Sequence, residues 1–260
     1  MTRTMLQRNT RFTLVCLGAL AAASGCDDSS QSPTPPPRAL PHVPLPGETG
    51  PLFALTAKAD YISTPDGGSI PIWGYAVGDG PMQYPGPTLI ADQGQEVVVN
   101  LTNQLPVSVS ILFPGQSILA TGGIDGELAR EAPPGQTVTY RFQATNPGTF
   151  VYYSGTDPEL QVEMGLVGAL IVRPALGASF AYDDPSTGFD IENLFLLTEM
   201  DPVIHDQAAD GDFAAIDHSA RFAVYWFING RNAPDTMLPH GVPWLPTQPY
   251  GAMSHMRPGE

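Results

Sequence analysis

The chain has 260 residues and a formal net charge of −15, and hydrophobic residues make up 42% of it, which suits a globular protein of one large or two modest domains. Nucleic-acid binding is excluded, because phosphate backbones are bound by Lys and Arg, and the chain has 11 of these against 26 Asp and Glu. Its 27 glycines and 28 prolines are well above the usual share of about 12%. Such a composition is typical of short strands joined by turns, so we expect an all-β fold.

The first 25 residues have the pattern of a secretory signal. Arg3, Arg8 and Arg11 precede an apolar run from Leu14 to Ala23, and small residues follow it. This run is too short to cross about 30 Å of hydrocarbon as a helix. We therefore predict a signal peptide over residues 1–25 and not a membrane-spanning segment.

The end of this signal resembles a bacterial lipobox, in which a cysteine after small residues receives a diacylglycerol group. The segment runs from Leu20 to Cys26, with Ala23 where the pattern prefers Leu. Cys26 is therefore the predicted lipid attachment site, and an ordinary signal with an incidental cysteine is the alternative. The lipid would anchor the exported protein at a bacterial membrane, facing the periplasm or the cell exterior. Residues 26–50, rich in Pro and Ser, are predicted to be an extended linker.

The two cysteines of the chain both lie near its N-terminus. Cys16 falls within the predicted signal and Cys26 at the lipid site, so the mature body would contain neither a free thiol nor a disulfide. A blue-copper electron-transfer site requires a Cys thiolate beside two His ligands. The chain cannot build such a site by itself.

Residues 51–175 contain a series of strand-like segments separated by Gly and Pro. In two of these segments the apolar side chains alternate, which places them on one face of each strand: Val97, Val99 and Leu101, and then Val138, Tyr140 and Phe142. Further strands are expected at 52–62, 69–77, 89–91, 149–153 and 165–172. Short strands at regular spacing predict a Greek-key β-sandwich.

Several ordered motifs run through the same region. They are Pro85-Gly86-Pro87-Thr88, Gly94-Gln95-Glu96-Val97, Leu101-Thr102-Asn103, Pro134 to Tyr140, Pro147 to Phe150 and Met164 to Val172. This set resembles the first plastocyanin-like domain of multicopper oxidases. The resemblance implies a cupredoxin-like sandwich over 51–175 and a copper-dependent oxidoreductase.

The copper ligands of that family are replaced in this chain. Where the resemblance implies His-x-His-Gly, the chain has Leu112 and Pro114 at the two His positions, and where it implies Tyr-His-Ser-His, it has Tyr153 and Gly155. Leu, Pro and Gly have no side-chain donor, and a neutral phenol is a poor substitute for imidazole. We therefore assign no metal, cofactor or catalytic residue to this chain, and copper is implied by the resemblance alone.

Residues 176–260 resemble the start of a second cupredoxin domain. Strand-like segments at 192–200 and 222–231 are followed by Ala233-Pro234-Asp235-Thr236, and the last residues, Met256 to Glu260, parallel the turn before the strand at Val97. A half sandwich exposes strand edges and an apolar face. Three explanations stay open: the chain is a fragment of a longer protein, another subunit supplies the missing strands, or residues 190–260 wrap the first domain.

Other titratable residues carry weaker signals. Asp157, Glu159 and Glu163 follow the second replaced motif, and Glu199, Asp201 and His205 lie at or after the end of the strand at 192–200. Without a nucleophile beside them, we interpret these carboxylates as solvated loop residues. The other histidines are His42, His218, His240 and His255, at no metal-binding spacing. Met253, His255 and Met256, with Met237 and His240 nearby, leave a soft Cu(I) site as a minor hypothesis.

Two functions from different classes follow. In the first, the chain is the N-terminal part of a copper-dependent oxidoreductase, anchored by lipid, whose copper sites need residues beyond this chain; the chain alone is then expected to be inactive. In the second, it is a non-catalytic cupredoxin-fold module for surface binding or assembly. A further cupredoxin domain or subunit that completes residues 176–260 is the expected partner.

Overall fold

The computed structural model describes residues 44–256. The predicted signal peptide, Cys26 and most of the predicted linker lie outside the described residues. Within residues 26–50, Glu48–Thr49 forms a short strand, β1, that pairs with β5 (Gly86–Asp92). Among the described residues there is no helix long and apolar enough to cross a membrane.

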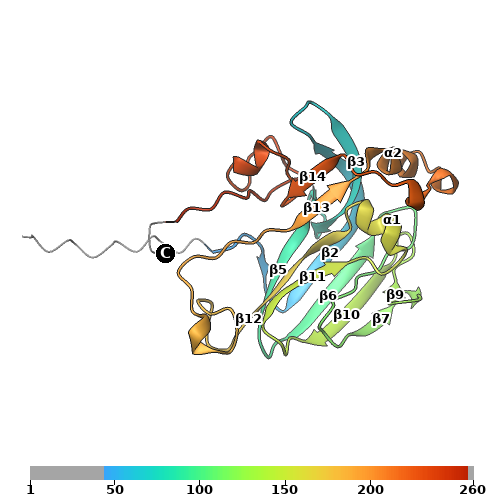
Figure 1. The fold of residues 1–260 in the computed structure, drawn as a ribbon. Helices are drawn as coiled ribbons and strands as arrows, with labels where there is room; N and C mark the ends of the chain where they lie inside the picture. The colour runs from blue at the N-terminus through green and yellow to red at the C-terminus, as the bar shows by residue number, and fades with distance from the viewer. Residues whose placement is uncertain (1–43, 257–260) are drawn as a thin grey trace, which may run out of the picture. The chain divides into compact units, whose positions relative to one another are not determined.

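Two β-sheets with a common core form the body of this unit (Figure 1). One sheet has the order β1-β5-β12-β11 and includes β11 (Gly148–Tyr153) and β12 (Val167–Arg173). The other has the order β4-β3-β2-β6-β10-β7 and comprises β2 (Leu52–Ser63), β3 (Ser69–Val77), β4 (Met82–Gln83), β6 (Glu96–Asn103), β7 (Leu119–Gly122) and β10 (Thr137–Gln143). The predicted all-β sandwich is confirmed.

The alternation read from the sequence places the core. Val97, Val99 and Leu101 of β6 are fully buried, and their neighbours along the strand are more exposed. β6 pairs antiparallel with β10, so that Val99 lies opposite Tyr140, whose side chain is also fully buried. Side chains of the two strands therefore cover one face of the sheet and pack toward the other sheet.

The remaining elements of the described chain are short. They are β8 (Ile124–Asp125), β9 (Arg130–Glu131), α1 (Pro158–Glu163), η1 (Pro185–Thr187), β13 (Leu197–Met200), α2 (Pro202–Ala209), η2 (Phe213–Ala215), η3 (His218–Ala220), β14 (Tyr225–Ile228) and η4 (Asp235–Met237). The sequence predicted longer strands at 192–200 and 222–231 and a polar loop between them. Instead, Asp201 begins α2 by accepting a hydrogen bond from the backbone N–H of Val203 at 3.0 Å, and Pro202 occupies the first turn, where its missing N–H costs nothing.

Residues 176–256 pack against the sandwich. Phe227 of β14 is buried and its ring meets that of Tyr84 edge to face, with centroids 5.6 Å apart. Further along, Gln248 exchanges two hydrogen bonds with the backbone of Ser63 at the end of β2, and α2 lies beside β3 (Figure 1). These contacts hold the described part of residues 176–260 against the sandwich. The assignment of 176–260 to a second domain stays a prediction.

Candidate functional site

The two segments in which the family's copper ligands are replaced lie side by side. The backbone N–H of Leu112 donates to the carbonyl of Tyr153 at 2.7 Å, and the N–H of Tyr153 donates back to Leu112 at 3.2 Å. This bridge brings Leu112, Tyr153 and Gly155 together at the end of β11. The resemblance implied this juxtaposition, although the two segments are far apart in the sequence.

The side chain of Leu112 fills the space beside Gly155. A Cβ atom added to Gly155 would lie 2.7 Å from Cγ of Leu112 and 3.1 Å from both of its methyl groups. Any larger side chain at this position must displace Leu112. Pro114 is exposed, and Tyr153 is half-buried with only a phenol to offer. The residues at these four positions therefore do not fit a copper ion, by donor chemistry and by the space available.

A neutral hydrogen-bond network lies next to these positions. The buried hydroxyl of Ser110 accepts from the backbone N–H of Gly155 at 3.1 Å and from the hydroxyl of Thr156 at 2.9 Å. The buried hydroxyl of Ser154 donates to the side-chain carbonyl of Gln161 at 2.6 Å, and the Gln161 amide donates to the Ser108 carbonyl at 2.8 Å. These bonds satisfy buried polar groups without charge, so this part of the interior is held together by hydroxyl and amide groups.

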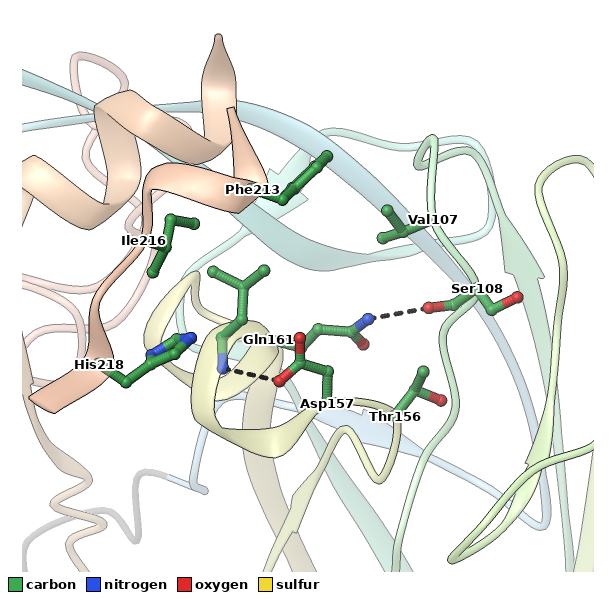
Figure 2. Close-up of a pocket in the computed structure, with 9 residues that line it drawn as sticks. Val107, Ser108, Thr156, Asp157, Gln161, Phe213, Ile216 and His218 are labelled. Atoms are coloured by element: carbon green, nitrogen blue, oxygen red, sulfur yellow. Dashed lines mark hydrogen bonds between the residues drawn. The ribbon is translucent and has the colours of Figure 1, made fainter. Parts of the chain in front are cut away.

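A pocket of about 240 Å³ opens above this network, between α1 and the segment 213–218 (Figure 2). Val107, Phe213 and Ile216 form an apolar wall, and Asp157, Gln161 and His218 contribute polar groups. Asp157 has a left-handed backbone with φ 47° and caps α1 through its carboxylate. Sequence reasoning missed this pocket, because it exists only where residues far apart in the chain, 107–108 and 213–218, meet beside α1.

Glu163, Asp201 and His205 form a buried cluster, so the interpretation of Glu163 and Asp201 as solvated loop carboxylates is wrong. All three residues are less than a tenth exposed. One Glu163 oxygen accepts the backbone N–H of Asp201 at 2.6 Å, and the other accepts Nε of Arg221 at 2.8 Å. The cluster forms because the end of α1, which carries Glu163, and the start of α2, which carries Asp201 and His205, meet next to β3. By contrast, Asp157 and Glu159 are exposed, as predicted.

His205 is the one fully buried histidine among the described residues. Its Nδ1 donates to the carbonyl of Pro71 at 2.7 Å, while Nε2 has no hydrogen-bond partner within the described chain and lies 3.7 Å from a Glu163 oxygen. Burial disfavours the charged imidazolium and lowers the pKa of His205 below its usual range, although the Pro71 carbonyl and the Glu163 carboxylate oppose this shift. The ring therefore acts as a neutral donor that ties α2 to β3.

The residues considered for a soft Cu(I) site have other surroundings. Nδ1 of His240 accepts the backbone N–H of Gly251 at 3.0 Å and is thus already engaged. Burial and the nearby Arg231 charge lower the pKa of His240. Met237 and Met256 are exposed, as is His255. His42 lies outside the described residues. The structure thus shows no joint site for these side chains over 237–256.

With the sandwich and the replaced ligand positions in place, the comparisons with known proteins define the class. The family model described as multicopper oxidase matches residues 64–176. The L-ascorbate oxidase of Cucurbita pepo var. melopepo is 40% identical over 107 residues, 39% of this chain and 19% of that protein. The copper-containing nitrite reductase of Alcaligenes xylosoxydans xylosoxydans is 33% identical over 150 residues, 54% of this chain and 41% of that protein.

Solved structures agree on the fold. The blue copper oxidase from Nitrosomonas europaea superimposes with a TM-score of 0.55 at 20% identity, over 73% of this chain and 56% of that one. The fold is that of a cupredoxin-like sandwich. Over residues 64–176 the chain is similar to multicopper oxidases. It spans less than half the length of the two curated relatives named above.

Proposed function

We propose that this chain is the N-terminal part of an exported, copper-dependent oxidoreductase, anchored through a lipid on Cys26, in which the domain at 51–175 holds no copper. The contact between Leu112 and Gly155, which fills the space where the resemblance implies a ligand, carries the copper-free part of the proposal, and the match of residues 64–176 to multicopper oxidases supports the oxidoreductase part. The greater length of the relatives supports the existence of further domains that would supply copper sites. The domain described here would then serve as a structural module.

The exposed face of the β13-β14 sheet supports a partner that completes residues 176–260. Leu197 pairs with Ile228 and Glu199 with Trp226, and the side chains of Leu197 and Trp226 are 71% and 67% exposed. Phe195 and Phe222 add further exposed apolar area near the same strands. Contiguous apolar surface of this kind favours association with another β-structure, either a further domain or a subunit.

Copper analysis tests the site assignment. The chain from residue 27 onward is purified without a tag, incubated with excess Cu(II) or with Cu(I), desalted, and analysed for bound metal. We expect no stoichiometric copper. Copper that is retained by the parent but lost from the variant Met253→Ala/His255→Ala/Met256→Ala would place the ion at the C-terminal segment. Copper that this variant also retains would refute a copper-free sandwich.

Two further measurements test the remaining parts of the proposal. An antiserum against the purified chain should detect in the source cells a protein much larger than the 27.6 kDa of this sequence. A band at or below that mass would favour the alternative, a non-catalytic cupredoxin-fold module for surface binding or assembly. Lipid anchoring predicts that the exported protein partitions into detergent and incorporates labelled fatty acid, whereas the variant Cys26→Ser does neither.

A further inference from the structure

We propose that the pocket between α1 and the segment 213–218 binds a small organic cation, namely a protonated primary amine carried on a compact apolar body. The proposal is independent of the copper question, because it uses none of the positions where copper ligands are replaced. It rests on the size of the pocket, on the apolar wall, and on the charge at the rim (Figure 2).

The size and the wall define the apolar part of the ligand. A volume of about 240 Å³ lies below the 300–1,000 Å³ that is usual for drug-sized ligands, so a single-ring compound fits better. Phe213 is 38% exposed, and its ring packs at a tilt against the ring of Trp73, with centroids 6.3 Å apart. An accessible ring offers both apolar contact and a π-face to a cation.

The rim defines the charge of the ligand. Asp157 presents an exposed carboxylate whose recorded hydrogen bond is a long one from the N–H of Leu160, at 3.4 Å. None of the side chains that line the pocket is Lys or Arg, so no fixed positive charge there neutralises this carboxylate. The net charge of −15 over the whole chain adds a field that attracts cations and repels anions.

The backbone of Asp157 indicates that the position of this carboxylate is specified. A non-glycine residue at φ 47° and ψ 67° adopts a conformation that is sparsely populated and costs energy unless the surroundings hold it. Behind it, both polar atoms of the Gln161 amide are occupied by Ser154 and Ser108. The Gln161 amide is therefore held by two hydrogen bonds, and the exposed carboxylate of Asp157 remains accessible to a ligand.

A bare metal ion fits the pocket less well than an amine. Of the lining side chains named here, Asp157 and His218 are metal ligands of the usual kind, and a protein metal site normally takes three or four. The apolar wall of Val107, Phe213 and Ile216 would contribute nothing to an ion. An ammonium group on a small ring uses the carboxylate and the wall together.

Phenethylammonium is a suitable probe, with 2-phenylethanol as its neutral isostere and phenylacetate as the anion. The chain from residue 27 onward is titrated at low salt and followed by the chemical shifts of its backbone amides. We expect saturable shifts at 107–109, 156–161 and 213–218 for the amine, and much weaker ones for the alcohol and the acid. Equal binding of the neutral isostere, or shifts that map elsewhere, would overturn the proposal.

Two variants identify the recognition groups. Asp157→Asn removes the charge but retains a side-chain carbonyl that can cap α1 and tolerates the left-handed backbone, so we expect the same unfolding temperature and amine binding weakened by about tenfold or more. Phe213→Leu, outside α1, should weaken binding by about two- to fivefold. Unchanged binding by Asp157→Asn contradicts the proposal. So does a response to Cu(II) or Zn(II) at the same amides that is stronger than that to the amine and is lost in His218→Ala.

Discussion

Gly155 is the position at which one added methyl group tests the packing of the replaced copper site. Its backbone is not in the positive-φ region, so alanine is compatible with the local conformation. The added Cβ would lie 2.7 Å from Cγ of Leu112 and 3.1 Å from each of its methyl groups. Normal carbon contacts are about 3.5–4.0 Å, so Leu112 must move by several tenths of an ångström or more.

We expect Gly155→Ala to lower the free energy of unfolding by about 1–3 kcal/mol, which is the usual cost of overpacking an interior. For a domain of this size, each kcal/mol shifts Tm by roughly 2–4 °C. Urea unfolding followed by tryptophan fluorescence and thermal unfolding followed by circular dichroism both measure this loss. Gly50→Ala is the matched control, because a Cβ there meets nothing nearer than 3.6 Å; its effect should stay within about 0.5 kcal/mol.

A double-mutant cycle isolates the contact. In the background Leu112→Ala the space beside Gly155 is open, so the same Gly155→Ala change should cost little, and the two substitutions should couple by about 1 kcal/mol or more. An equal cost of Gly155→Ala in both backgrounds would refute the reasoning. Leu112 would then not occupy the ligand position, and only the lack of donor groups would argue against copper at this site.

Three further predictions concern the buried cluster around Glu163 and His205 and the exposed face of the β13-β14 sheet. Burial holds the pKa of His205 in the folded protein below the value of about 6.5 for an unfolded chain. Just below pH 6.5 the unfolded chain therefore binds more protons at this residue than the folded protein does. The contribution of neutral His205 to the free energy of unfolding is thus present above about pH 6.5 and is lost as the pH falls below that value. His205→Asn can still donate to the Pro71 carbonyl but does not titrate, so the free energy of unfolding in urea should depend less on pH between pH 7.5 and 5. An unchanged pH dependence would show that His205 is not the group responsible. Glu163→Ala should cost about 1–3 kcal/mol in the same assay, since it leaves the buried backbone N–H of Asp201 without its acceptor and leaves Arg221 paired with Glu199 alone. A loss below about 0.5 kcal/mol would show that water replaces the carboxylate. Leu197→Thr/Trp226→Thr should leave the free energy of unfolding within about 0.5 kcal/mol, because both side chains are exposed, and should reduce self-association in sedimentation velocity; a large destabilisation would show that these side chains are buried.

The strands of the sandwich could be predicted from the sequence because their signals are local. Val97, Val99 and Leu101 alternate with polar or less buried residues, so in a strand their side chains lie on one face, which must be buried. All three side chains are fully buried in the structure. The strand predicted at 69–77 has those bounds in the structure. The ordered motifs of 85–172 were also sufficient to indicate the family that the comparison with residues 64–176 supports.

The short elements and the charged cluster could not be predicted in this way. Asp201 followed by Pro202 is a start signal for a helix and could have indicated α2. Nothing local distinguishes Glu163 from the exposed Glu159, since both follow the same turn and lie on the same short helix. Burial is set by what packs on a residue, and Glu163 is covered by segments that lie far along the chain.

The sequence by itself determined the strands, the turn positions and the identity of the residues at 112, 114, 153 and 155, because periodicity and residue chemistry are properties of short segments. The tertiary structure alone decided that Leu112 fills the space at Gly155, that His205 is enclosed beneath β3, and that Asp157 and Phe213 face one pocket. Each of these is a contact between segments separated along the chain. Such contacts depend on how the sheets and loops close on one another, which short-range pattern does not specify.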